Sequence, residues 1–185
     1  ASKGEGLGNQ FLATIREVDA IAHVVRCFED SDITHVDGKV APIADIDTID
    51  TELMLADLES LEKRVDNLSK KAKGGDKDSK EQLDLVNRAL SLLRDGKPAR
   101  FLERKPEEER AFRMLGLLTS KPVLYVCNVE EASAGTGNSF SEAVMARAKE
   151  EDAVAVVISA KIESEIATLS RAERTDFLDT LGLHE

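Results

Sequence analysis

The 185-residue sequence contains little cysteine and proline and no long apolar run, and each shortage excludes a class of protein. Its two cysteines, Cys27 and Cys127, lie far apart without the spacing of a metal-ligand set, so we expect reduced thiols of a cytosolic protein. Four prolines and the lack of a low-complexity tract argue against extended disorder. No apolar segment approaches the roughly 18 residues of a membrane span, so we expect a cytoplasmic protein without a membrane partner.

Basic residues are also outnumbered, since 25 Lys and Arg against 36 Asp and Glu give a formal net charge of −11. This balance excludes a protein that coats nucleic acid, and we expect no DNA partner. Contact with RNA would need a local basic patch. Hydrophobic residues make up 42% of the chain, which is enough for one packed α/β domain with a modest insertion.

The sequence opens on a charged, glycine-rich stretch, residues 1–8, with no initiating Met and no preceding strand. We interpret this stretch as a loop that continues from earlier residues, and we expect the chain to be a fragment. Apolar residues at helical spacing follow up to Val18, with Asn9 as the expected cap.

Three apolar runs of strand length occur along the chain, at residues 20–28, 122–128 and 153–159. Such runs are typical of parallel strands that are buried on both faces. A helical pattern at Ser139–Glu150 separates the last two runs, which makes a parallel crossover unit, and a final helix is predicted at residues 171–181. The sequence therefore predicts an α/β fold with a parallel sheet.

The segment between the first two runs is too long for a simple crossover and carries two helical stripes with 3-4 spacing. The stripes are Leu58, Leu61, Val65, Leu68 and Ala72, and then Leu83, Val86, Leu90 and Leu93. A turn-rich link at residues 74–78 joins them, with Ser79 as the expected cap of the second helix. These features predict an antiparallel helical hairpin of coiled-coil type, and the alternative is an ordinary helix pair packed on a globular core. A further helix is predicted at residues 106–118.

Polar residues follow the second and third apolar runs, where open parallel sheets bind their ligands. The first group is Asn128-Val129-Glu130-Glu131, and the second is Ser159-Ala160-Lys161. Together they resemble the Asn-Lys-x-Asp and Ser-Ala-Lys base-binding motifs of P-loop GTPases. An Asn amide at a strand end offers both a donor and an acceptor to a base. Glu131 stands where those proteins have the Asp that reads guanine, and Val129 replaces their Lys, so guanine selectivity is expected to weaken.

The resemblance extends over essentially the whole chain to the YchF (Obg-like ATPase) subfamily of TRAFAC P-loop GTPases. The opening residues 1–13 resemble its switch II segment, residues 22–30 its following strand and loop, and residues 70–78 the tip of its helical insertion. The Asn-x-x-Glu motif at residues 128–131 resembles its altered base motif. The resemblance implies a magnesium-dependent hydrolase that prefers ATP, binds GTP more weakly and associates with ribosomes or ribosomal RNA.

The resemblance also implies a division of the chain and a set of site residues. Residues 1–44 and 106–185 would form two parts of a nucleotide-binding core, and residues 45–105 the hairpin insertion. The phosphate-binding loop, with its Mg²⁺ ligand, and a C-terminal TGS domain would lie outside these residues, so the 185-residue chain alone is expected not to hydrolyse ATP. The expected base-binding residues are Asn128, Val129, Glu131, Ser159, Ala160 and Lys161.

The three histidines have different expected roles. His35 lies in a loop beyond a strand end, where an imidazole could reach a γ-phosphate and help to orient water, and a solvated loop histidine is the alternative. His23 is expected in the core, and His184 at the terminal surface.

Basic residues gather near the hairpin tip of an otherwise acidic chain. Lys70, Lys71, Lys73 and Lys77 are the expected contacts with the phosphate backbone of ribosomal RNA, alongside Lys63, Arg64 and Lys80. A solvated coiled-coil end is the alternative. For the whole chain, the main alternative to an ATPase fragment is a non-catalytic interaction module, a helical hairpin on an α/β base.

Overall fold

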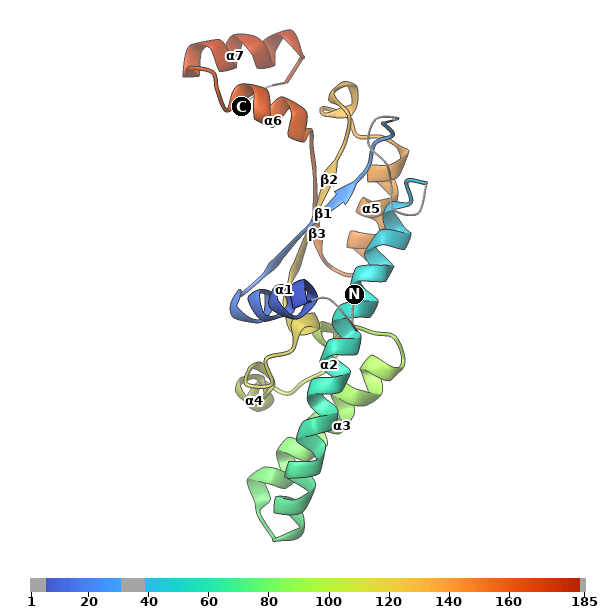
Figure 1. Cartoon of the computed structure of the whole chain (residues 1–185), viewed down its shortest axis with the longest axis vertical. Helices are drawn as coiled ribbons and strands as arrows, with labels where there is room; N and C mark the ends of the chain where they lie inside the picture. Colours follow the sequence, from blue (N-terminus) through green and yellow to red (C-terminus); the bar gives the residue numbers. More distant parts are fainter. Residues whose placement is uncertain (1–5, 31–38, 184–185) are drawn as a thin grey trace. The chain divides into compact units, whose positions relative to one another are not determined.

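The computed structural model describes residues 6–30 and 39–183, which form two compact units. One unit contains residues up to Ile21 together with Asp47–Pro122, and the other contains Ala22–Ile46 and the residues from Val123 onward. The predicted α/β class with a parallel sheet and a helical hairpin is confirmed (Figure 1). None of the helices in the described ranges combines the length and the apolar character of a membrane span.

Among the described residues, the sheet has three strands in the order β1-β2-β3, formed by Ile21–Arg26, Val123–Asn128 and Val154–Ile158. β2 and β3 are parallel, with Leu124 opposite Val154 and Asn128 opposite Ile158. β1 runs in the same direction as β2, because Ile21 N donates to Pro122 O at 3.0 Å and Cys27 N donates to Asn128 O at 2.8 Å.

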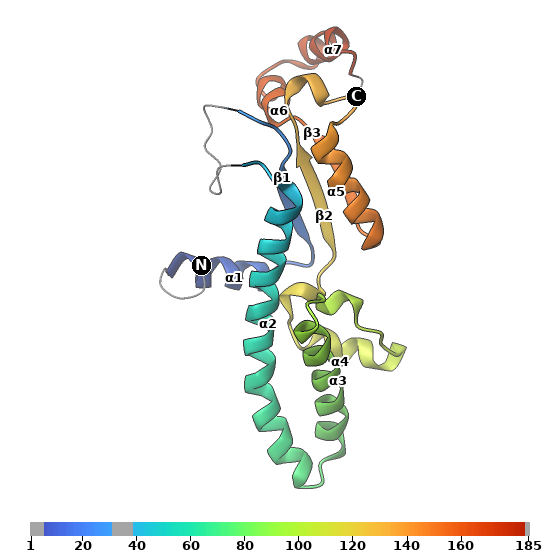
Figure 2. The same cartoon turned by 90° about the vertical axis from the view of Figure 1, so that its right-hand side faces the viewer.

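One face of the sheet is buried and the other is partly open, so the predicted burial on both faces is wrong. The buried face packs against α5 (Ser139–Glu150), whose bounds match the prediction, through residues such as Tyr125 and Val144 (Figure 2). On the other face Val24 is 64% and Val154 63% exposed. An apolar run alone cannot distinguish a strand covered on both sides from one covered on one side.

The long segment between β1 and β2 forms the predicted hairpin from α2 (Pro42–Lys73) and α3 (Lys77–Arg94). Most residues of the predicted stripes meet in one core cluster, in which Leu61 of α2 lies with Val86, Leu90 and Leu93 of α3. Ala72 and Leu83 are not part of this cluster, and Leu85, which was not predicted, is. Arg94 also pairs with Glu62 at 2.9 Å across the hairpin. The coiled-coil character of this pair stays a prediction.

Two expected helix caps are wrong. α3 begins at Lys77 with Asp76 as its N-cap, and Ser79 lies in the first turn, where its hydroxyl donates to the Asp76 carboxylate. The serine hydroxyl is engaged by a residue three positions earlier in the chain, and that residue holds the cap position. α1 (Gly6–Glu17) begins before Asn9, which therefore lies inside the helix.

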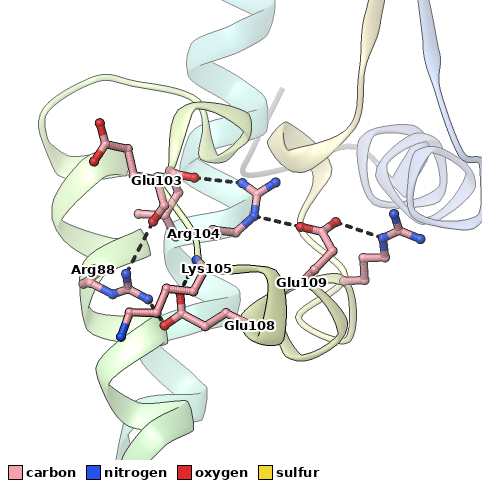
Figure 3. A network of polar contacts seen from close by, with 8 residues as sticks. Arg88, Glu103, Arg104, Lys105, Glu108 and Glu109 are labelled. Atoms are coloured by element: carbon pink, nitrogen blue, oxygen red, sulfur yellow. Dashed lines mark hydrogen bonds and ion pairs between the residues drawn. The ribbon is translucent and has the colours of Figure 1, made fainter.

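The helix predicted at residues 106–118 is broken into short pieces. α4 covers Glu109–Arg113, between 3-10 turns at Pro106–Glu108 and Leu118–Ser120. Gly116, at φ +63°, interrupts the helix, since other residues rarely adopt this conformation. Two ion pairs fix residues 104–109 in place (Figure 3). Arg88 of α3 pairs with Glu108 at 2.5 Å, and Arg104 pairs with Glu109 at 3.1 Å.

Two further helices belong to the second unit, α6 (Ala160–Ile166) and α7 (Arg171–Thr180). α7 begins with a capping box of Ser170 and Glu173, and it ends before Gly182 at φ +70°, as the sequence predicts.

Candidate functional site

The two predicted base motifs lie at the same edge of the sheet. Asn128 ends β2 and pairs with Ile158, the last residue of β3, so the loops that follow both strands start side by side. Val129 N donates to Ile158 O at 2.8 Å and extends this pairing by one residue. The parallel register therefore brings residues 128–131 and 159–161 together, although 27 or more residues separate them in the sequence.

Asn128 connects the two motifs directly. Its Oδ1 accepts a hydrogen bond from the backbone N of Ala160 at 2.9 Å. Within the part of the chain that the structure describes, no partner is recorded for its Nδ2, which leaves an amide donor at the strand end. An Asn amide that fixes a neighbouring loop and keeps one donor free is suited to binding the edge of a base.

Ser159 and Val129 are buried beside this contact. Ser159 is the N-cap of α6 and 3% exposed, and its hydroxyl has no hydrogen-bond partner among the described residues. A buried hydroxyl without a partner is costly and could be satisfied by a ligand. Val129 is also 3% exposed and packs in the core of the sheet, so a ligand could meet its backbone but not its side chain.

A second contact joins the same two loops at the surface. Lys161 Nζ and Glu131 Oε2 form an ion pair of 2.5 Å, with the side chains 66% and 40% exposed. The hydrogen bond that Lys161 donates to the Glu131 carboxylate raises the pKa of Lys161, and Glu165 and Asp30 add to this effect. The position that resembles the guanine-reading Asp is therefore occupied by a carboxylate that already has a cationic partner.

Asn138, which the sequence analysis did not single out, positions the loop after β2. Its Oδ1 accepts from the backbone N atoms of Phe140 and Ser141 and caps α5, while its Nδ2 donates to Cys27 O at 2.7 Å and Glu130 Oε2 at 3.0 Å. One amide thus fixes the end of β1, the loop and the start of α5. The available sequence signal was an Asn directly before a helical pattern.

Glu130 and Gly137 also belong to the loop after β2 and allow Asn138 to make these contacts. The Ser133 hydroxyl lowers the pKa of the Glu130 carboxyl, which keeps it ionised beside Asn138. Gly137 has φ +74°, and a Cβ there would lie 2.7 Å from Ser141 Oγ. A side chain at residue 137 would therefore disturb the helix cap.

The sequence analysis also named three histidines and two cysteines. His35 and His184 are outside the described residues, and His23 is half-buried with its ring centroid 5.9 Å from that of Tyr125. Cys27, directly after β1, and Cys127, on β2, are buried free thiols, and the hydrogen bond between them, together with burial, raises the pKa of Cys27. Among the described residues, no group of three or more His, Cys, Asp or Glu could hold a metal ion.

The lysines at the hairpin tip are exposed. They differ from the other basic residues nearby in their polar contacts. Lys63 pairs with Glu59 at 2.7 Å, and Arg64 donates to Met114 O at 3.3 Å. No ion pair is recorded within the described ranges for the remaining five, Lys70, Lys71, Lys73, Lys77 and Lys80. Two aspartates, Asp76 and Asp78, lie among them in the sequence.

Comparisons with known proteins give consistent relatives, although no family model matches the chain. The chain is 49% identical over 187 residues to the ribosome-binding ATPase YchF of Bacillus subtilis, and 48% identical over 185 residues to that of Escherichia coli O157:H7. Each match covers 100% of this chain and 51% of the relative. A solved structure of the Schizosaccharomyces pombe YchF GTPase superposes with a TM-score of 0.86 at 30% identity, again over 100% of this chain and 51% of that one. The chain thus spans about half the length of the relatives that it matches.

Proposed function

Since the chain belongs to the YchF family, matching about half of its relatives' length, we propose that it supplies the base-recognition half of an ATP site in a ribosome-associated P-loop hydrolase. The observation that carries this proposal is the meeting of the two base motifs at the carboxyl edge of the sheet, through the Asn128–Ala160 hydrogen bond. The relatives' names supply the activity class and the ribosome as partner.

In this proposal, the residues at the carboxyl edge of β2 and β3 bind the base. The phosphates are bound by residues that do not belong to this edge. The free amide donor of Asn128 and the buried hydroxyl of Ser159 face a base edge, and the backbone of Val129 and Ala160 limits its position. The sequence contains no Gly-x-x-x-x-Gly-Lys-Ser/Thr run, so these 185 residues lack the cradle that orients the phosphates. Magnesium would arrive with ATP and contribute charge neutralisation at the phosphates, and the isolated chain should show no ATPase activity above background.

Two further roles follow from the same proposal. The lysines at the hairpin tip contact ribosomal RNA through its phosphates, which supplies the attraction that an acidic chain otherwise lacks. His35 orients the attacking water near the γ-phosphate; this role rests on the sequence, because the residue lies outside the described ranges.

Nucleotide titration tests the proposal. A full-length protein carrying this segment should bind ATP more tightly than GTP, because Glu131 is one methylene longer than the Asp that reads guanine. Glu131→Asp should shift the ratio of affinities about tenfold toward GTP, the scale of one misplaced methylene in a binding site. We would measure both dissociation constants by calorimetry, with Glu150→Asp, an exposed glutamate on α5, as the matched control.

Two outcomes would contradict the proposal. Tighter binding of GTP than of ATP by the parent would remove the proposed selectivity. Binding of neither nucleotide would favour the non-catalytic interaction module, in which the sheet edge has a structural role.

A further inference from the structure

We infer that Lys161 determines base selectivity by occupying the Glu131 carboxylate, so that the Lys161–Glu131 pair disfavours guanine. The inference rests on the proposed function and deepens it, because it assigns a cause to the preference for adenine. Lys161 is the second residue of α6, and Glu131 begins the 3-10 turn after β2 (Glu131–Ser133). The pair therefore joins the two loops that carry the base motifs.

The chemistry of the two bases explains the expected discrimination. Guanine presents two adjacent donors, N1–H and the N2 amino group, and a bidentate contact requires both oxygens of a carboxylate. Glu131 Oε2 is engaged by Lys161 Nζ at 2.5 Å, so that contact would require the ion pair to open. Adenine has a lone pair at N1 instead, and a free carboxylate would repel it. A carboxylate neutralised by an ammonium group tolerates adenine better.

A neighbouring contact acts in the same direction. The backbone N–H of Ala160 could donate to the O6 carbonyl of guanine, but it donates to Asn128 Oδ1 at 2.9 Å. Adenine has an amino group at the equivalent position and does not need this donor. The Lys161–Glu131 ion pair and the Ala160–Asn128 hydrogen bond thus occupy a carboxylate and an N–H that guanine would require and adenine would not.

The exposure of the Lys161–Glu131 pair favours a role in base selectivity over a role in the stability of the fold. With side chains 66% and 40% exposed, such a pair contributes little to folding and is weakened by salt. Asp30 and Glu165 also raise the pKa of Lys161, so the ammonium group remains charged near neutral pH. Replacing Lys161 should therefore change base preference without unfolding the site.

The test compares Lys161→Gln with the parent in a full-length protein carrying this segment. The ratio of GTP to ATP affinity should rise about threefold to fivefold, the range expected for the loss of one exposed ion pair. Lys149→Gln removes an exposed lysine of α5 and should leave the ratio unchanged. In a Glu131→Gln background, Lys161→Gln should have no further effect on the ratio, because the carboxylate that it controls is gone. Discrimination against GTP by the parent should also weaken as salt is raised.

The outcomes separate this inference from the proposed function. A parent that prefers ATP, with an unchanged ratio in Lys161→Gln, would overturn the role of Lys161 and leave the ATP site standing. An equal change in the Glu131→Gln background would show that Lys161 acts on the base directly, which also overturns the inference. A parent that binds neither nucleotide would overturn both.

Discussion

Asp57→Ala is expected to lower the free energy of unfolding of the unit that contains Asp47–Pro122 by about 4 kcal/mol, the scale of removing one partner from a buried charged network. Asp57 of α2 is 0% exposed. Its carboxylate accepts hydrogen bonds from Leu118 N at 2.8 Å, Thr119 N at 2.8 Å and Thr119 Oγ1 at 2.7 Å. Alanine would leave three buried donors without an acceptor.

The position of Asp57 explains why its loss should affect the whole base of the hairpin. Thr119 Oγ1 also accepts a hydrogen bond from Ala99 N at 3.0 Å. The network therefore connects α2, the chain just after α3 and the chain just before β2. Burial raises the pKa of the Asp57 carboxyl, while the hydrogen bonds from Thr119 and Leu118 lower it, so these donors are what make a buried carboxylate tolerable.

Chemical denaturation followed by circular dichroism measures this effect. Asp66→Ala, an exposed aspartate of the same helix, is the matched control and should change stability by less than about 0.5 kcal/mol. Asp57→Asn keeps one acceptor and should fall between the parent and the alanine variant. If Asp57→Ala were as stable as Asp66→Ala, the network would contribute nothing to the fold.

Reversing the charge of Lys70, Lys71, Lys73 and Lys77 to Glu should weaken ribosome binding by about a hundredfold or more at low salt. These lysines are exposed and have no ion pair within the described ranges, so each is available to neutralise a phosphate. Every such contact releases a counterion, which makes affinity fall as salt rises. The slope of log affinity against log salt should become shallower by about four if all four lysines contact phosphate.

Binding to purified ribosomes over a range of salt concentrations tests this prediction. The matched control reverses four exposed lysines away from the tip, Lys39, Lys97, Lys105 and Lys149, and changes the net charge equally. ATP affinity should be nearly the same in both variants. Equal loss of ribosome binding in the two variants would mean that net charge, and not the tip, controls the interaction.

Much of the fold could be predicted from periodicity and spacing. Apolar runs of strand length located the three strands of the described sheet, and the helical pattern at Ser139–Glu150 gave the bounds of α5. The stripe from Leu58 to Ala72 located the hairpin, because residues three and four apart share one helix face. The base motifs could be placed at one edge because parallel strands end on the same side of a sheet.

The remaining features depend on contacts between residues distant in sequence. Asp57 follows Leu53 and precedes Leu61 at helical spacing, so a buried acid was visible as a polar residue on an apolar face, but its partners lie 61 and 62 residues away. The open face at Val24 and the turn at Gly116 depend on which elements cover them and on backbone conformation. The pairing of Lys161 with Glu131 needs the register of β2 and β3, which no local pattern gives.

A crystal structure of a full-length protein carrying this segment, with a non-hydrolysable ATP analogue, tests the central claim most directly. We predict adenine at the carboxyl edge of β2 and β3, within hydrogen-bond distance of Asn128 Nδ2 and beside Ser159, with the Lys161–Glu131 pair still formed. Adenine bound at another surface, with the Asn128 and Ser159 side chains out of contact with the nucleotide, would contradict the assignment of this edge as the base site.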